Sequence, residues 1–144
     1  MIESIESSSK VYFDANILIY LIEGTGPVQQ KIVEALAVFE QSGASLHISN
    51  IGVAECLYGA HKSNSEILLQ QYQDIFYDVG LFELVPVDND RIIAAAKLGA
   101  EKNLKLVDAT HFLAAVEMEC EVFLTNDRRF KSSHGIKVVQ IDEL

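Results

Sequence analysis

Four acidic residues lie at positions in this sequence where a carboxylate could have a chemical role and not only contact solvent. Asp14 interrupts the apolar stretch VYFDANILIY, and Glu55 lies among apolar and small residues in NIGVAECLYGA. Asp108 begins the segment DATHFLAA, and Asp127 comes just after the apolar run EVFLT. Carboxylates that crowd together repel one another, and hard divalent cations with oxygen ligands can neutralise them. We therefore interpret these acids as candidate metal ligands.

Each acid also has a purely structural interpretation. Asp14 and Asp108 can each cap the N-terminus of a helix, Asp127 suits a turn, and Glu55 could be a solvated helix position. Glu55 is the hardest to explain in this way, because a carboxylate with apolar neighbours needs a partner. For a single residue the structural interpretation has the better odds, and only the four together indicate a site.

Strand and helix patterns alternate along the chain, which favours a parallel sheet covered by helices on both faces. The expected strands are residues 10–14, 45–49, 82–87, 121–125 and 136–141. The expected helices are residues 16–22, 27–42, 50–62, 65–79 and 88–103, with a short loop and a last helix within 105–120. Ligands of such a sheet bind at the carboxyl ends of the strands, where Asp14 and Asp127 would lie.

Length and composition limit the class of protein. The chain of 144 residues suits one compact domain, and we expect a single domain over residues 1–144, with residues 1–9 as a short flexible N-terminal segment. Hydrophobic residues make up 49% of the chain, which excludes a disordered protein, yet no apolar run approaches the ~18 residues that span a bilayer. Without a secretory signal, we expect a cytoplasmic protein in which Cys56 and Cys120 are buried thiols.

The net charge of −10 argues against general electrostatic binding of nucleic acid. A nucleic acid would have to be held through divalent cations or a local basic patch. Arg128, Arg129 and Lys131 follow Asp127 in the turn NDRRFK and could hold RNA phosphates. A solvated turn is an equally good interpretation of these residues.

His111 lies three residues after Asp108, on roughly the same face of the expected helix. It could act as a general base, but a packed or hydrogen-bonded structural histidine is the favoured interpretation. The spacing of His47, His61 and His134 indicates no metal site.

Together, these segments resemble the PIN domain family, and within it the VapC-type ribonuclease toxins of VapBC toxin–antitoxin pairs. The resemblance lies in FDANILIY, SNIGVAECLYG, LVDATHFLAA and FLTNDRRF, in that order, and it extends over nearly the whole chain. It implies an α/β fold of three layers, α/β/α, with a central parallel sheet of four to five strands. It also implies metal-binding catalytic acids with two supporting polar residues. The acids are Asp14, Glu55, Asp108 and Asp127, and the supporting residues are Asn16 and Thr125.

The same resemblance implies hydrolysis of RNA phosphodiester bonds with Mg²⁺ or Mn²⁺. Such an ion lowers the pKa of a bound water and stabilises charge on the phosphate in the transition state. It would also let an acidic cleft receive a polyanion.

Two protein partners are implied as well. One is a second copy of the chain, because the expected helix 65–79 carries Leu68, Tyr72, Ile75, Phe76 and Val79 on one side and could pair through them or bury them in the core. The other is an antitoxin that presents arginine or lysine to the carboxylates and packs an apolar helix nearby.

Other functions could use the same acids. A metal-dependent phosphatase or a DNA nuclease needs a similar site. A phosphoacceptor module would require an acidic pair after the first strand and a lysine after the last, whereas FDAN contains one acid. An inactive PIN-like binding module would not need all four acids.

Overall fold

A computed structural model of the chain describes residues 9–144 and contains a five-stranded sheet in the order β3-β2-β1-β4-β5. All neighbouring strands are parallel, which confirms the expected sheet. The strands are β1 (Lys10–Phe13), β2 (Ser45–Ser49), β3 (Glu83–Val85), β4 (Val122–Thr125) and β5 (Lys137–Gln140). Strand β3 ends earlier than expected, at Val85, because the next residue is Pro86, which has no N–H to donate to the sheet.

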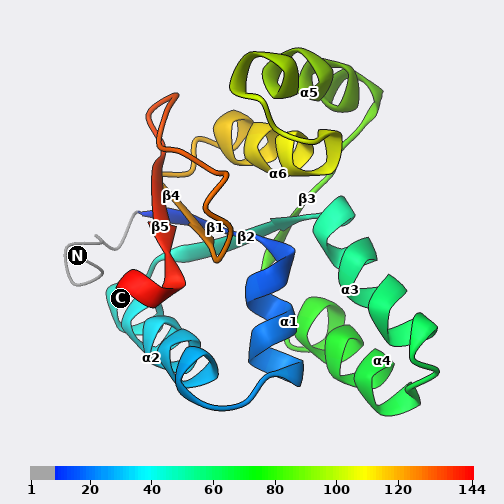
Figure 1. Cartoon of the computed structure of the whole chain (residues 1–144). Helices are drawn as coiled ribbons and strands as arrows, with labels where there is room; N and C mark the ends of the chain where they lie inside the picture. The colour runs from blue at the N-terminus through cyan, green and yellow to red at the C-terminus, as the bar shows by residue number, and fades with distance from the viewer. Residues whose placement is uncertain (1–8) are drawn as a thin grey trace.

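Helices cover both faces of this sheet (Figure 1). They are α1 (Ala15–Glu23), α2 (Pro27–Ser42), α3 (Asn50–Lys62), α4 (Glu66–Gln73), α5 (Asn89–Lys102) and α6 (Leu106–Glu117). Helices α5 and α6 lie together on one face, whereas α1 and α2 lie on the other, and α3 and α4 form an adjacent pair (Figure 1). The three-layer α/β/α arrangement is therefore confirmed.

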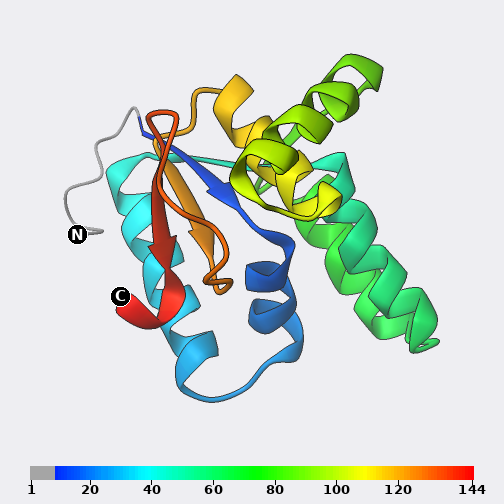
Figure 2. The same ribbon diagram turned by 45° about the horizontal axis from the view of Figure 1, so that its top comes forward.

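Alternation along β1 decides which residues serve each layer, because successive strand side chains point to opposite faces. Val11 and Phe13 belong to the apolar cluster formed with α1 to α4. Tyr12 points the other way and packs with α5 and α6. Figure 2 shows β1, β4 and β5 running side by side in one direction, with α1 continuing from the end of β1. Strand β1 therefore contributes Tyr12 to one core and delivers Asp14 to the carboxyl edge.

The expected helix 65–79 is interrupted. Helix α4 is followed by one π-helical turn, η2 (Asp74–Asp78), which adds a residue to the turn and shifts the positions beyond it. Tyr72 and Phe76 are buried, so the core alternative holds for them, whereas Val79 is 72% exposed and does not share their face. The prediction for Val79 was wrong, because the 3.6-residue period does not continue through a π turn.

Three further expectations can be compared with the structure. Cys56 and Cys120 are free and buried, as expected, and burial raises the pKa of both thiols to about 12. None of the described helices is long and apolar enough to cross a membrane. Residues 1–8 of the expected flexible segment lie outside the described residues, and Ser9 is already buried, its carbonyl accepting the N–H of Ser45.

Candidate active site

Asp14 lies at the carboxyl edge of the sheet, directly after β1. Its backbone N–H donates to the carbonyl of Leu124 (3.0 Å), and its side chain is buried. Asp14 occupies the capping position of α1, yet its carboxylate makes no capping hydrogen bond and instead accepts one from the Thr125 hydroxyl at Oδ2 (2.7 Å). The capping interpretation of this side chain was therefore wrong. Burial raises the pKa of Asp14, although His111 and Thr125 act in the opposite direction.

Thr125 connects two of the four acids. Its hydroxyl oxygen, which donates to Asp14, also accepts the backbone N–H of Asp127 (3.0 Å). Gln140 of β5 adds a second anchor, because its Nε2 donates to the carbonyl of Asp127 (2.9 Å). The loop after β4 is thus held to the ends of three neighbouring strands, β1, β4 and β5.

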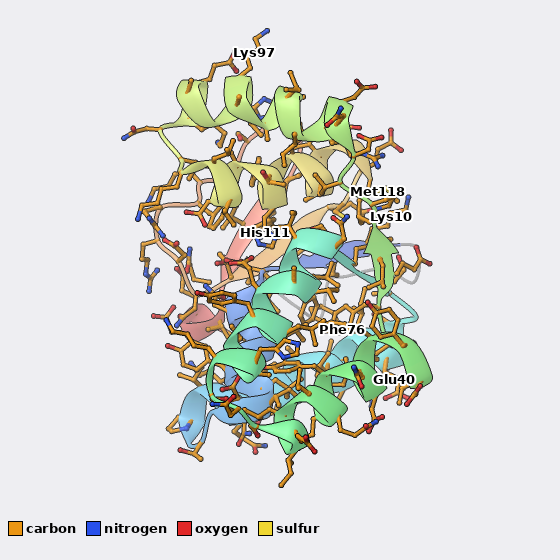
Figure 3. The ribbon with its side chains drawn as sticks, turned by 90° about the vertical axis from the view of Figure 1, so that its right-hand side faces the viewer. Lys10, Glu40, Phe76, Lys97, His111 and Met118 are labelled. Atoms are coloured by element: carbon orange, nitrogen blue, oxygen red, sulfur yellow. The ribbon has the colours of Figure 1, made fainter. Side chains whose placement is uncertain are left out.

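A buried hydrogen-bond chain leads from β2 to Glu55. The N–H of Ser49 donates to the Tyr12 hydroxyl oxygen (3.1 Å), so the Tyr12 proton is available to His111 Nδ1 (2.8 Å). Burial raises the pKa of Tyr12, which keeps that proton in place. His111 Nδ1 is then an acceptor, and the N–H at Nε2 faces Oε1 of Glu55. Figure 3 shows His111 between α6 and α3.

His111 itself is 1% exposed, and its Nε2 also lies 4.0 Å from Oδ1 of Asp14. Burial lowers the pKa of His111, but the hydrogen bond to Glu55 and the nearby carboxylates outweigh it and raise the pKa overall. Gly52 makes this arrangement possible, because a Cβ there would lie 3.1 Å from His111 Cε1 and 2.6 Å from the side chain of Ile48. His111 is thus a buried, hydrogen-bonded histidine, as the sequence favoured, and its partners belong to the site. We call Asp14, Glu55 and His111 the histidine half of the site.

Asp108 and Asp127 form the other side together with Arg129. The guanidinium of Arg129 donates to both oxygens of Asp127 (2.6–3.1 Å) and lies 3.3 Å from Oδ2 of Asp108. These hydrogen bonds lower the pKa of Asp127. Burial raises the pKa of Asp108, against the effect of Arg129. We call Asp108, Asp127 and Arg129 the arginine half of the site.

Two expectations about the acids need correction. The apolar neighbours of Glu55 in sequence do not enclose it, because its side chain is 42% exposed, as in a solvated helix position, while it also contacts His111. Asp108 is not a cap, since it is the third residue of α6 and the capping position is Lys105. Asp127 does serve its turn, because its Oδ1 accepts the N–H of Arg129 (2.9 Å).

The three basic residues of the turn do not form one patch. Arg128 pairs with Asp142 (2.5 Å) and Glu143 (2.6 Å) of the 3₁₀ helix η3 (Ile141–Glu143). Arg129 belongs to the arginine half, and Lys131 is exposed. Of the three residues expected to hold phosphates, Arg128 and Arg129 are therefore engaged with acids in this structure.

The four acids are close enough to influence one another. The charges of Glu55 and Asp108 each raise the pKa of Asp14, and those of Asp127 and Glu55 raise the pKa of Asp108. The side-chain oxygen of Asn16 is buried and accepts no hydrogen bond from the described residues. This set of oxygen donors fits a hard divalent cation. As they are placed, however, no three His, Cys, Asp or Glu side chains among the described residues form a group that could hold one.

Sequence reasoning missed Tyr12, Ser49 and Gln140, which hold the site together. Tyr12 carried a usable signal, because a hydroxyl within the apolar strand KVYF must find a hydrogen-bond partner when it is buried. Ser49 and Gln140 carried no such signal, since their contacts depend on how the strands are paired.

Comparison with known proteins agrees with this architecture. The profile of the family described as "PIN domain" matches residues 11–134. Among curated proteins, none matches the sequence significantly.

Several solved structures share the fold. VapBC2 from Rickettsia felis, bound to a promoter DNA fragment, has a TM-score of 0.73 and 20% identity over 91% of this chain and 98% of that chain. A toxin–antitoxin complex from Klebsiella pneumoniae has a TM-score of 0.67 and 27% identity over 91% and 97%. VapC20 from Mycobacterium tuberculosis, described as a toxin that cleaves the sarcin–ricin loop, has a TM-score of 0.63 and 13% identity over 78% and 86%.

Proposed function

Because this chain belongs to the PIN domain family, we propose that it is a metal-dependent endoribonuclease and the toxin of a toxin–antitoxin pair. One observation carries this proposal: hydrogen bonds and ion pairs through Thr125, His111 and Arg129 connect all four acids at the carboxyl edge of the sheet. The toxin–antitoxin complex from Klebsiella pneumoniae and the RNA-cleaving VapC20 support it, since both share the fold. RNA is also cytoplasmic, the compartment we expect for this protein.

Asp14, Glu55, Asp108 and Asp127 would hold Mg²⁺ or Mn²⁺. When bound, the ion supplies an activated water and charge stabilisation for the phosphodiester. Around it, the protein's own groups orient the ligands. Thr125 aims one oxygen of Asp14 by donating to the other.

Glu55 and Asn16 complete the proposed site. His111 holds the Glu55 carboxylate on the side where Asp14 lies. This contact restricts the motion of a side chain that is 42% exposed. Asn16 offers a buried carbonyl oxygen as further polar support.

Incubation of the purified protein with RNA tests the enzymatic proposal. We expect cleavage with Mg²⁺ or Mn²⁺ and none with EDTA, with Asp108→Asn as the inactive control of the same shape. Single-stranded DNA and a phosphomonoester are included as alternative substrates. Faster turnover of either one would replace the ribonuclease by a DNA nuclease or a phosphatase. No turnover of any of them, with circular dichroism that shows a folded protein, would favour a binding module.

We propose an antitoxin partner on the same grounds. A segment of that partner would present arginine or lysine to the acids, since opposite charges attract strongly in a partly desolvated cleft. Co-expression with the product of the neighbouring small gene should yield a copurifying complex without ribonuclease activity. Replacing the partner's arginine should restore cleavage. A neighbour that neither binds nor inhibits would remove the toxin assignment and leave the nuclease.

A homodimer is the second assembly we propose. Large apolar side chains stay exposed on α3, on α4, in the π turn that follows and directly after it. They are Tyr58, Ile67, Tyr77 and Val79. A second copy could cover some of these side chains. Light scattering at micromolar concentration should give twice the chain mass, and a monomer mass would contradict the proposal.

A further inference from the structure

The guanidinium of Arg129 lies where the two acids of the arginine half would have to meet a metal ion. Its Nε and Nη2 atoms donate to Asp127 Oδ1 and Oδ2, and Nη2 lies 3.3 Å from Asp108 Oδ2. One planar cation thus bridges two carboxylates from different segments, β4–β5 and α6. Such forked contacts are among the stronger charge-assisted hydrogen bonds.

A divalent ion bound by Asp108 and Asp127 would use the same oxygens. Mg²⁺ takes its ligands at about 2.0–2.1 Å and tolerates little deviation from octahedral geometry. The lone pairs of Asp127 that now accept from Arg129 cannot also meet that geometry.

The side chain of Arg129 can move away from the two acids. It is 52% exposed, so the guanidinium can turn into solvent without disturbing the core, while the backbone N–H can stay on Asp127 Oδ1. His111 differs, since its ring is 1% exposed and is enclosed between α6 and α3.

We propose that Arg129 is an internal competitor of the divalent cation, and that its release from Asp108 and Asp127 sets the affinity of this site for metal. This inference rests on the proposed function, because it requires that the acids bind a divalent ion. Arg129 offsets one of the two negative charges of Asp108 and Asp127 before metal arrives and makes binding a one-for-one exchange of cations. It is a positioning residue, since it acts on the ion through the two carboxylates.

Titration of the metal-free full-length protein with Mn²⁺ in a calorimeter tests the exchange. Arg129→Gln should bind roughly tenfold more tightly, as expected if Arg129 occupies the carboxylates about 90% of the time. Arg129→Lys should fall between Gln and Arg, because lysine keeps the charge and loses the fork. Equal dissociation constants for wild type and Arg129→Gln would overturn the inference.

Two matched variants distinguish the effect of the Arg129 contacts from the effect of losing one positive charge nearby. Arg128→Gln removes the same charge one residue away, where the side chain pairs with Asp142 and Glu143. Lys105→Gln removes a charge that acts on Asp127 through its field. Both should bind Mn²⁺ within about twofold of wild type, since they leave the Arg129 contacts in place. A gain equal to that of Arg129→Gln would reduce the effect to net charge and overturn the inference.

The Arg129 Nε–H resonance gives a direct signal. In metal-free protein this proton is held by Asp127 and should be resolved and slow to exchange with water. Saturating Mg²⁺ should shift it and speed its exchange, and an unchanged resonance would contradict displacement. If the affinity for metal falls on substitution of Asp108 but does not change on substitution of Arg129, this inference is refuted and the proposed function still stands. Absence of binding in wild type and in every variant would remove both.

Discussion

The two halves of the acidic site each pair their carboxylates with a cation-forming side chain of the same chain, but the two side chains differ in burial. His111 is 1% exposed and hydrogen-bonded on both ring nitrogens, whereas Arg129 is 52% exposed and donates to Asp127 through Nε and Nη2. The histidine half is held by a chain that continues into the core through Tyr12. The arginine half depends on a surface turn. One half is therefore preorganised, and the other can rearrange when a ligand arrives.

This comparison predicts that both halves are needed for catalysis. Asp14→Asn and Asp108→Asn should each lower metal-dependent RNA cleavage by at least about 100-fold, because ligand charge is worth several kcal/mol to a phosphoryl transition state. The isosteric amides should leave the circular dichroism spectrum unchanged. Comparable cleavage by either purified variant would exclude its half from the catalytic site.

The free energy of unfolding should depend more on the histidine half than on the arginine half. His111→Ala should lower the free energy of unfolding by about 2–4 kcal/mol, because it leaves the buried Tyr12 hydroxyl without its acceptor and opens a cavity. Arg129→Ala should not shift the urea midpoint measurably, since exposed ion pairs contribute little. Urea unfolding in EDTA measures both variants. Equal losses would mean that burial does not distinguish the halves.

The buried chain behind His111 can be tested one hydroxyl at a time. Tyr12→Phe should cost about 1–2 kcal/mol of unfolding free energy, since the Ser49 N–H loses its acceptor and His111 Nδ1 loses its donor. Tyr77→Phe is the control, because Tyr77 is 60% exposed. A Tyr12→Phe protein as stable as wild type would show that the chain does not support the fold.

The pH dependence of stability should have opposite signs for two of the acids, Asp14 and Asp127. Burial raises the pKa of Asp14, so its stabilising contribution is complete below the ordinary value of 3.8 and is lost as pH rises through the raised pKa. In EDTA at pH 7, Asp14→Asn should therefore melt roughly 2–4 °C above wild type, with the gap closing toward pH 4.

Asp127 provides the opposite case. Arg129 lowers its pKa, so its contribution is present above 3.8 and is lost as pH falls through the lowered value. Asp127→Asn should bring no gain in melting temperature at pH 7. Calorimetric scans from pH 4 to pH 7 measure both variants, and a shared sign would show that the carboxylates are not held in different environments.

Local pattern was sufficient for most of the fold. Pro27 and Gly43 mark the ends of α2, as their backbone preferences require, with Gly43 at φ +73°. The alternation of strands and helices requires crossovers and hence parallel pairing. The 3.6-residue helical period gave a wrong prediction at Val79, because the π turn before it changes the number of residues per turn. Position after a strand likewise indicated that Asp14 and Asp127 lie at the carboxyl edge.

The sequence by itself determined where carboxylates could meet, because strand direction and strand ends follow from residue patterns a few positions long. Only the tertiary structure decided which side chain each carboxylate meets. Glu55 and His111 are 56 positions apart, and His111 and Tyr12 are 99 apart. No local period encodes such pairs, which depend on strand order and on the close approach of α3 to α6 at Gly52. Arg129 shows the same limit at short range, since its side chain could as well have faced solvent, whereas in the structure it contacts both Asp127 and Asp108.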